Sequence, residues 1–218
     1  MTRLKLARRS TAMYVPAAFA ADDPAELARL IRQNAFATVI STGADGLIAS
    51  HVPLLYRPDQ GRHGTLVGHL AGPNPQVEAI RAGASMLAIF SGPHAYVSPG
   101  WYQTAPAVPT WNYVAVHASG HARALDDAAA AAVVAELAAV YEAGRDPPWR
   151  FADQPPAFLA GMLRGIVAFE IPIDRLEGKA KLSQNRGQAD RAGVVQGLRA
   201  ENDPGAQALA DLMAASVL

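Results

Sequence analysis

The 218-residue sequence contains no cysteine, only three lysines against 16 arginines, and no excess of charge of either sign. The missing cysteines exclude disulfide bridges, thiolate-ligated zinc, iron–sulfur clusters and cysteine nucleophiles. Basic and acidic residues number 19 each, which argues against a protein that coats nucleic acid nonspecifically, because such a protein needs surplus cations facing the phosphates. Because the sequence has no cysteine, any redox role would have to be carried by a bound cofactor.

Long apolar runs are missing as well. No stretch approaches the roughly 18 residues that cross a bilayer. The basic start, residues 1–9, is followed by a segment that Tyr14 and Pro16 interrupt, so no signal peptide is predicted. We expect a cytoplasmic protein without a membrane partner. With 50% hydrophobic and 17% charged residues the chain is globular, and its length predicts a single domain over residues 1–218 with a helical C-terminal extension.

Turn signals divide the chain into short β-rich runs, predicted at residues 36–42, 47–56, 65–70, 85–90, 111–117 and 165–171. Cap and proline signals predict helices at residues 24–31, 75–80, 126–141, 188–199 and 204–215. Because regular alternation of strands and helices is missing, a doubly wound parallel sheet is not expected. The pattern predicts a mainly β fold with α additions: an antiparallel sheet or barrel with a helical insertion and a helical C-terminus.

The densest cluster of aromatic residues lies between Phe90 and Tyr113. Six of the 15 aromatics fall in this stretch, together with four prolines and two glycines. Proline and glycine at this density predict a rigid, irregular loop. Tryptophan and tyrosine on such a loop bind flat rings well, because a large π-face is presented at little entropic cost. The alternative is a hydrophobic loop that closes a barrel end or an interface.

A polar run, residues 181–186, offers an ammonium, two amides, a hydroxyl and a guanidinium within six positions. Such a cluster suits a phosphate or the carbonyl edge of a heterocycle. The alternative is a solvated helix start, since Ser183 and Asn185 are both good caps. Common catalytic and nucleotide-binding signatures are absent, and the spacing of the six histidines predicts no metal site.

Several strings occur in an order that is similar to one known family. They are Met13–Pro16 with Phe19, His51–Leu54, Gly68–His69 with Asn74–Gln76, Phe90–Pro99, Trp101–Tyr102, Val108–Tyr113, His117, Gly120, Lys181–Arg186 and Asp190–Arg191. From Met13 to about Met213 the sequence resembles the PaiB-type FMN-binding negative transcriptional regulators, a branch of the flavin-binding split barrels. It departs from that pattern at Gly72–Pro73, Val77 and Gly100.

The resemblance implies a six-stranded antiparallel split barrel that forms a homodimer, with FMN in a groove between the subunits. It assigns no catalytic residue. The candidate cofactor-binding residues that it implies are Ser50, His51, His69, Asn74, Tyr96, Ser98, Trp101, Tyr102, Thr110, Trp111, Asn112, Lys181, Gln184, Asn185 and Arg186.

Three further functions remain open at the level of sequence. The first is a flavin-dependent oxidoreductase that acts on an unknown small substrate. The second is a transcriptional repressor that contacts DNA, which the family name implies but the neutral charge and scattered arginines support poorly. The third is a haem-binding split barrel with His51, His69 or His117 as ligand.

Overall fold

The protein forms one long antiparallel sheet in the computed structural model, which describes residues 13–215. The basic start, residues 1–9, lies outside the described residues. The hydrogen-bonded order of strands is β3-β2-β6-β7-β9-β5-β4, and β1 and β8 also pair with β9. The strands are β1 (Ala20–Ala21), β2 (Phe36–Gly43), β3 (Gly46–Pro53), β4 (Leu55–Arg57), β5 (Thr65–Ala71), β6 (Ser85–Val97), β7 (Thr110–His121), β8 (Arg123–Ala124) and β9 (Ile166–Lys181).

The expectation of six strands was wrong, because the described residues form nine. The predicted run 47–56 breaks at Leu54 into β3 and β4. The two-residue strands β1 and β8 exist only because they pair with the long strand β9, so no local sequence pattern announces them.

Helices lie between and after the strands, largely where caps predict them. They are α1 (Pro24–Gln33), α2 (Gln76–Arg81), α3 (Asp127–Glu142), α4 (Pro156–Leu163), α5 (Gln188–Ala200) and α6 (Pro204–Ala215), with 3₁₀ turns η1 (Ala17–Phe19), η2 (Pro99–Trp101) and η3 (Phe151–Asp153). Asp23 caps α1 by accepting from the Ala25 amide at 3.2 Å, and Asp126 caps α3 by accepting from the Ala129 amide at 2.8 Å. Helix α4 forms where no helix was predicted.

The two ends of the sheet, β3 and β4, meet through the chain itself. Buried Leu54 joins them, and its amide donates to the Ala35 carbonyl at 2.9 Å. Gly68 on β5 leaves space for the connection between β3 and β4, since a Cβ at residue 68 would lie 2.7 Å from the Leu54 side chain and 3.1 Å from the Pro53 oxygen. The two edge strands are therefore joined by a covalent connection beside a glycine and not by a further ladder of hydrogen bonds, so the sheet stays open.

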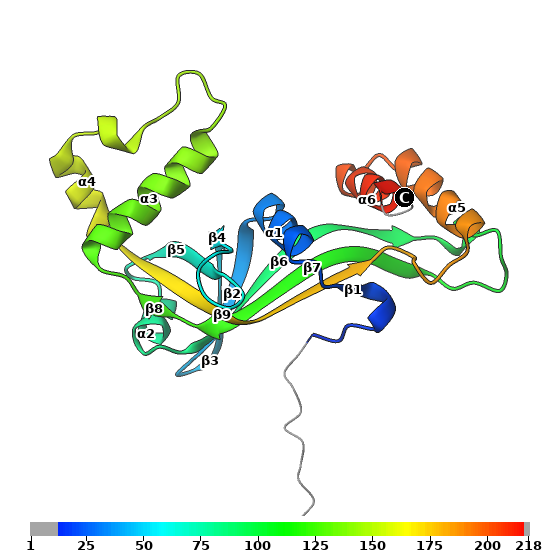
Figure 1. Cartoon of the computed structure of the whole chain (residues 1–218), viewed down its shortest axis with the longest axis horizontal. Helices are drawn as coiled ribbons and strands as arrows, with labels where there is room; N and C mark the ends of the chain where they lie inside the picture. The colour runs from blue at the N-terminus through cyan, green and yellow to red at the C-terminus, as the bar shows by residue number, and fades with distance from the viewer. Residues whose placement is uncertain (1–12, 216–218) are drawn as a thin grey trace, which may run out of the picture.

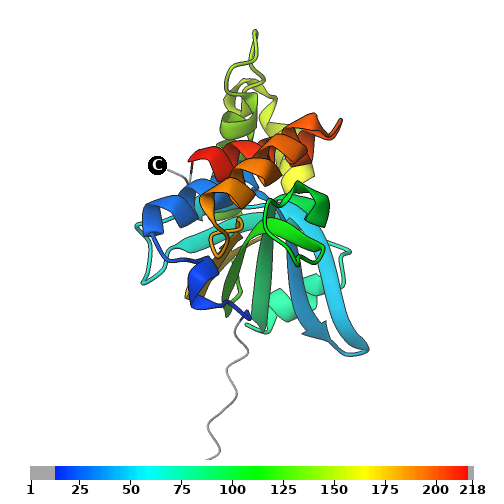
Figure 2. The same cartoon turned by 90° about the vertical axis from the view of Figure 1, so that its right-hand side faces the viewer.

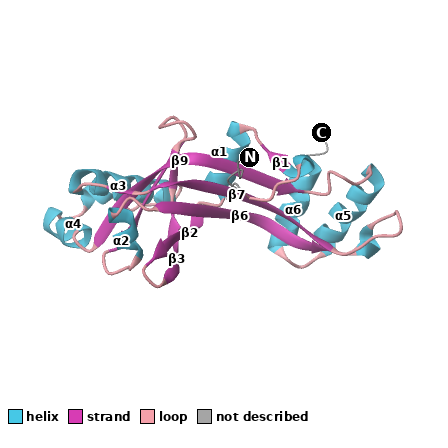
Figure 3. Ribbon diagram, turned by 90° about the horizontal axis from the view of Figure 1, so that it is seen from below, coloured by secondary structure: helices cyan, strands magenta, loops and turns pink. Residues whose placement is uncertain are grey.

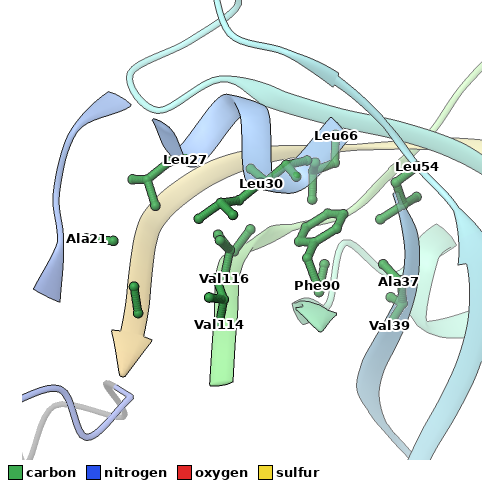
Figure 4. Packing of buried hydrophobic residues seen from close by; sticks show 14 of the residues in the cluster. Ala21, Leu27, Leu30, Ala37, Val39, Leu54, Leu66, Phe90, Val114 and Val116 are labelled. Atoms are coloured by element: carbon green, nitrogen blue, oxygen red, sulfur yellow. The ribbon is translucent and has the colours of Figure 1, made fainter. Parts of the chain in front are cut away.

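The main hydrophobic core lies on the side of the sheet that faces α1 and α6. Leu27 and Leu30 of α1 lie over Val114 and Val116 of β7, with Phe90 of β6 beside them (Figure 4). A leucine or phenylalanine side chain that is fully buried contributes about 1.5–3 kcal/mol relative to an exposed one. This packing keeps the central strands β6, β7 and β9 in place.

Two helical regions sit at opposite ends of the molecule. Helices α3 and α4 occupy one end, and α5 and α6 pack together over the other end of the long strands (Figures 1 and 2). Where α6 covers β6, the opposite side of β6 and β7 carries no α-helix among the described residues (Figure 3), while the segment with Tyr14 and η1 lies against this side of β9. We call this side the bare face, defined by the outward side chains of His94, Tyr96, Trp111, Tyr113 and Lys181. No helix in residues 13–215 is long and apolar enough to span a membrane.

The aromatic stretch between Phe90 and Tyr113 is less irregular than predicted. Strand β6 continues through Val97, past a bulge between Ser91 and His94, and β7 begins at Thr110, so only residues 98–109 form an irregular loop. The bulge accommodates Pro93, which cannot donate to the ladder. Strand β9 likewise runs ten residues beyond the predicted end at residue 171, because β7 pairs with it as far as Lys181.

Candidate functional site

The aromatic part of the bare face is built from a cross-strand pair. Tyr96 of β6 and Trp111 of β7 are direct partners, and both are about half exposed. Their ring centroids lie 6.1 Å apart with an interplanar angle of 75°, and the His94 ring lies 6.4 Å from that of Trp111. Edge-to-face packing holds these rings while leaving apolar surface open, which suits contact with another planar ring.

Two ammonium groups lie beside these rings on β9. Lys181 pairs with Tyr113 across the ladder and donates to the Thr110 hydroxyl. Burial lowers the pKa of Lys181, and the nearby charge of Lys179 acts in the same direction. Lys179 is buried: it donates to the Tyr14 carbonyl at 3.0 Å and lies 5.1 Å from the centre of the Tyr113 ring. Lys181 is therefore the ammonium with room for an anionic group.

The irregular loop 98–109 is fastened to α5 by one carboxylate. Asp190 accepts hydrogen bonds from the Gln103 amide at 2.8 Å, the Thr104 amide at 3.0 Å and the Thr104 hydroxyl at 2.5 Å. The bond from the Thr104 hydroxyl is the main cause that lowers the pKa of Asp190. At the start of the loop, the Ser98 hydroxyl accepts from the Gly100 amide at 3.2 Å and caps η2.

Two aromatic side chains of the same loop also pack on this end of the chain. Trp101 fills a notch on α5 formed by Gly193 and Gly197, where a Cβ at either position would collide with it. The Arg186 guanidinium lies 4.4 Å from the centre of the Tyr102 ring, a cation–π contact that covers one ring face. Trp101, Tyr102 and Arg186 therefore hold the loop against α5.

Most of the polar run after Lys181 is engaged within the chain. Asn112 is fully buried and donates to Ser183 Oγ at 2.9 Å. The Gln184 side chain accepts from the Leu182 amide at 2.7 Å and donates to the Ala180 carbonyl at 2.5 Å. Asn185 is exposed in the same turn. These bonds shape the exit from β9 and leave Lys181 and Arg186 as the charged groups of the run.

A separate polar cluster joins α2 to β2 and β3. Asn74 donates to Ser50 Oγ at 3.0 Å and accepts from the Gln76 amide at 2.9 Å. Gln76, which was not a predicted site residue, is buried, and its amide donates to Ser41 Oγ at 3.0 Å. A buried polar side chain at the first residue of a short helix leaves no sequence signal that distinguishes it from a surface glutamine.

The two remaining candidate histidines lie apart from these groups. His51 on β3 is exposed, with Nδ1 3.1 Å from Thr38 Oγ1 and its ring stacked at 6.4 Å on Phe36. His69 on β5 lies beneath α3 and α4, where burial lowers its pKa.

The structure thus brings Tyr96, Trp111 and Lys181 together on the bare face, and Lys181 bonds to Thr110 at the start of β7. Lys179 and Tyr113 also belong to this group, although neither was a predicted site residue. The alternation of side chains along a strand puts residues 111 and 113 on one face of β7 and residues 179 and 181 on one face of β9, and pairing of Tyr113 with Lys181 makes these the same face of the sheet. This alternation could be used only if the extension of β9 to Lys181 was known.

The comparisons with known proteins identify the family. Residues 13–175 match the family model described as "Putative FMN-binding domain". The sequence is 37% identical over 201 residues to the "Protease synthase and sporulation protein PAI 2" of Bacillus subtilis, an alignment that covers 92% of this chain and 96% of the relative. The chain belongs to the PaiB-type family. The predicted family is confirmed, and the match supports FMN as the cofactor of this PaiB-type protein.

Solved structures with low sequence identity share the fold of this PaiB-type chain. The flavocytochrome Anf3 from Azotobacter vinelandii superposes with a TM-score of 0.61 at 13% identity, covering 80% of this chain and 75% of that one. The FAD and heme binding protein from Mycobacterium smegmatis gives 0.57 at 19% identity, covering 79% and 78%. The predicted split-barrel class is confirmed, with an open sheet of nine strands in the described residues instead of six.

Proposed function

We propose that this PaiB-type chain acts as a homodimer that holds FMN on the bare face, at the interface between two protomers. The observation that carries the proposal is the half-exposed Tyr96–Trp111 pair beside Lys181. The isoalloxazine of FMN is planar and largely apolar, which suits contact with the two aromatic rings. The phosphate of FMN is anionic, which suits the neighbouring ammonium group.

Each group on the bare face has a distinct task in this proposal. Tyr96 and Trp111 provide the surface for the flavin ring, and Lys181 with Thr110 provides the donors for the phosphate. When bound, FMN supplies redox chemistry that a chain without cysteine cannot perform with its own side chains. Partial burial lowers the pKa of Lys181, and a phosphate beside it would raise that pKa by Coulomb attraction.

Homodimer formation is supported by the apolar character of the same side of the sheet. Thr38 of β2 pairs with Ile89, which pairs with His117, so the outward side of β2 continues that of β6 and β7. Phe36 and Leu47 lie on this continuation and are 69% and 80% exposed. Exposed large apolar side chains on one continuous face are typical of a protein–protein interface. A second copy would cover them.

The test is an FMN titration followed by flavin fluorescence, with the mass of the complex measured in parallel. We expect a dimer that binds FMN, and a Trp111→Ala variant whose affinity is about tenfold weaker, because a ring stacked on the flavin contributes about 1–1.5 kcal/mol. Trp149→Ala, at the other end of the molecule, is the matched control and should bind like the wild type. Equal affinities of the two variants, or tight binding by a monomer, would contradict the proposal.

The name of the B. subtilis relative refers to protease synthesis and sporulation. We propose that any regulatory role of this chain runs through the flavin-bound dimer rather than through direct contact with DNA. Arginines among the described residues are interspersed with acidic partners, for example Arg57 with Glu136 and Arg199 with Asp211. Direct contact would give an affinity that falls steeply with salt. We expect no measurable binding of duplex DNA even at low salt.

A further inference from the structure

A second pocket lies at the end of the sheet remote from the bare face. Helices α3 and α4, with η3, cover the outward side of β5 and leave a pocket of about 270 Å³. His69 is the polar residue of its lining. The described lining is otherwise apolar: Val134, Trp149, Phe151, Phe158, Leu159, Met162, Leu163 and Ile166. Ala168, the β9 partner of His69, precedes Lys181 by 13 residues, so this pocket is separate from the candidate flavin site.

The helical wall of this pocket exposes apolar side chains that residues 13–215 do not cover. All eight residues of α4 are apolar, yet none is buried, and Phe158 and Met162 are 53% and 60% exposed. The neighbouring wall is ordered by internal contacts: Trp149 packs edge-to-face on Phe151 at 6.4 Å, and its amide donates to Glu142 at 3.0 Å. A fixed, aromatic-lined concavity with one polar group is the usual form of a small-molecule site.

His69 presents a hydrogen-bond donor to this pocket. Its Nδ1 is buried, and no group among residues 13–215 bonds to it. Burial lowers the pKa of His69, so the imidazole is neutral near pH 7 and carries one proton. A buried N–H without a partner is rarer in proteins than an unpaired acceptor, which favours the tautomer with the proton on Nε2. Because Nδ1 is enclosed, the accessible edge of the ring is the one that carries Nε2–H.

We propose that this pocket binds a small planar aromatic compound that carries a neutral acceptor oxygen, of the aromatic ketone class. The ring lies against Trp149 and Phe158, and the carbonyl oxygen accepts from His69 Nε2. The volume falls just below the range of roughly 300–1,000 Å³ that is usual for drug-sized ligands, so the ligand is small. No cationic side chain lines the pocket in the described part of the chain, so a carboxylate is not favoured. The proposal does not depend on FMN binding.

The experiment compares two probes of the same shape, acetophenone and α-methylstyrene, in which a C=CH₂ group replaces C=O. Each is titrated into the full-length protein while the NMR signals of the indole N–H groups are followed. The sequence has three tryptophans, and a Trp149→Phe variant identifies the signal of Trp149. We expect both probes to shift the Trp149 signal, with acetophenone about fivefold tighter, since one hydrogen bond contributes about 1 kcal/mol. Equal affinities, or a Trp149 signal that does not saturate, would overturn the proposal.

Three variants separate the hydrogen bond from the apolar contact. His69→Leu should make the two probes bind equally, whereas Phe158→Ala should weaken both by a similar factor. Val140→Ala is the matched control, because Val140 is an exposed apolar residue of α3 that does not line the pocket. A preference for acetophenone that persists in His69→Leu, or a loss in Val140→Ala equal to that in Phe158→Ala, would also overturn it.

Discussion

The buried amide of Asn112 donates from Nδ2 to Oγ of Ser183 at 2.9 Å, which ties β7 to the turn that follows β9. Ser183 has φ of 61°, the one positive value at a non-glycine position among residues 13–215. A left-handed conformation is unfavourable for an L-residue by about 1–2 kcal/mol, so the hydrogen bond offsets a local strain. The pair sets the direction in which the chain leaves β9 and thereby positions Lys181.

Substitutions at Ser183 should separate the hydrogen bond from the backbone conformation. Both Ser183→Ala and Ser183→Gly leave the Asn112 amide without this acceptor, but glycine adopts the left-handed conformation without penalty. We expect Ser183→Ala to lose about 2 kcal/mol of unfolding free energy and Ser183→Gly about 1 kcal/mol less. Urea denaturation measures both. Equal losses would show that the positive φ carries no strain.

The glycine notch on α5 should tolerate no side chain. A Cβ at residue 193 would collide with the Trp101 carbonyl oxygen, which belongs to the backbone and cannot turn aside. We expect Gly193→Ala to destabilise the protein by about 1–3 kcal/mol through this overlap. Gly161→Ala on α4 is the control, because its Cβ meets only the end of Arg164 at 3.8 Å. It should stabilise the helix by up to about 1 kcal/mol, so thermal unfolding of the two variants should shift in opposite directions.

Lys181 should distinguish FMN from riboflavin, which lacks the phosphate. We expect Lys181→Met to weaken FMN binding about tenfold and to leave riboflavin binding nearly unchanged, since a charge-assisted hydrogen bond contributes about 1.5–3 kcal/mol. Arg164→Met removes one positive charge from an exposed position near α4 and controls for net charge. Fluorescence titrations with both flavins measure the effect. A similar loss for both ligands would place Lys181 away from the phosphate.

The stability of the protein should fall at mildly acidic pH in part because of His69. Its pKa is lowered in the fold, so below the unfolded value of about 6.5 the unfolded state binds the proton more readily. Unfolding free energy should therefore decrease as pH falls from about 7.5 through 6.5 and level off below the folded pKa. His69→Leu should flatten this decrease, and His117, whose pKa burial also lowers, should account for part of the remainder. An unchanged pH profile in His69→Leu would contradict this account.

Local signals in the sequence were enough to predict most elements of the fold. The caps Asp23 and Asp126 locate two helices correctly, because a cap needs only its own neighbours. The extensions of β6 and β9 were not predictable in the same way. Strand β9 passes through Pro172 and several charged residues, and it stays extended because β7 and β5 pair with it along its length. Such pairing is a property of the assembled sheet.

The candidate site was predictable only in its residue types. Tyr96, Trp111 and Lys181 were expected as ligand-binding residues, and the structure places them on one face. In the sequence, Asn112 and Gln184 cannot be distinguished from amide side chains that are free to bind a ligand. In the structure, their amides bond within the chain, to Ser183 and to the backbone of residues 180 and 182. The type of a polar residue does not show whether its side chain bonds within the chain or to a ligand. The pairing of the strands in the folded sheet determines this.

The scarcity of lysine makes the bare face chemically addressable. Lys5 lies outside the described residues, Lys179 is buried against Tyr14, and Lys181 is half-buried at the end of β9. The lowered pKa of Lys181 increases the fraction of its amine that is unprotonated and therefore nucleophilic. An amine-directed label should thus attach at Lys181 in preference to Lys179, and the extent of labelling becomes a direct gauge of how much of this sheet surface is covered in solution.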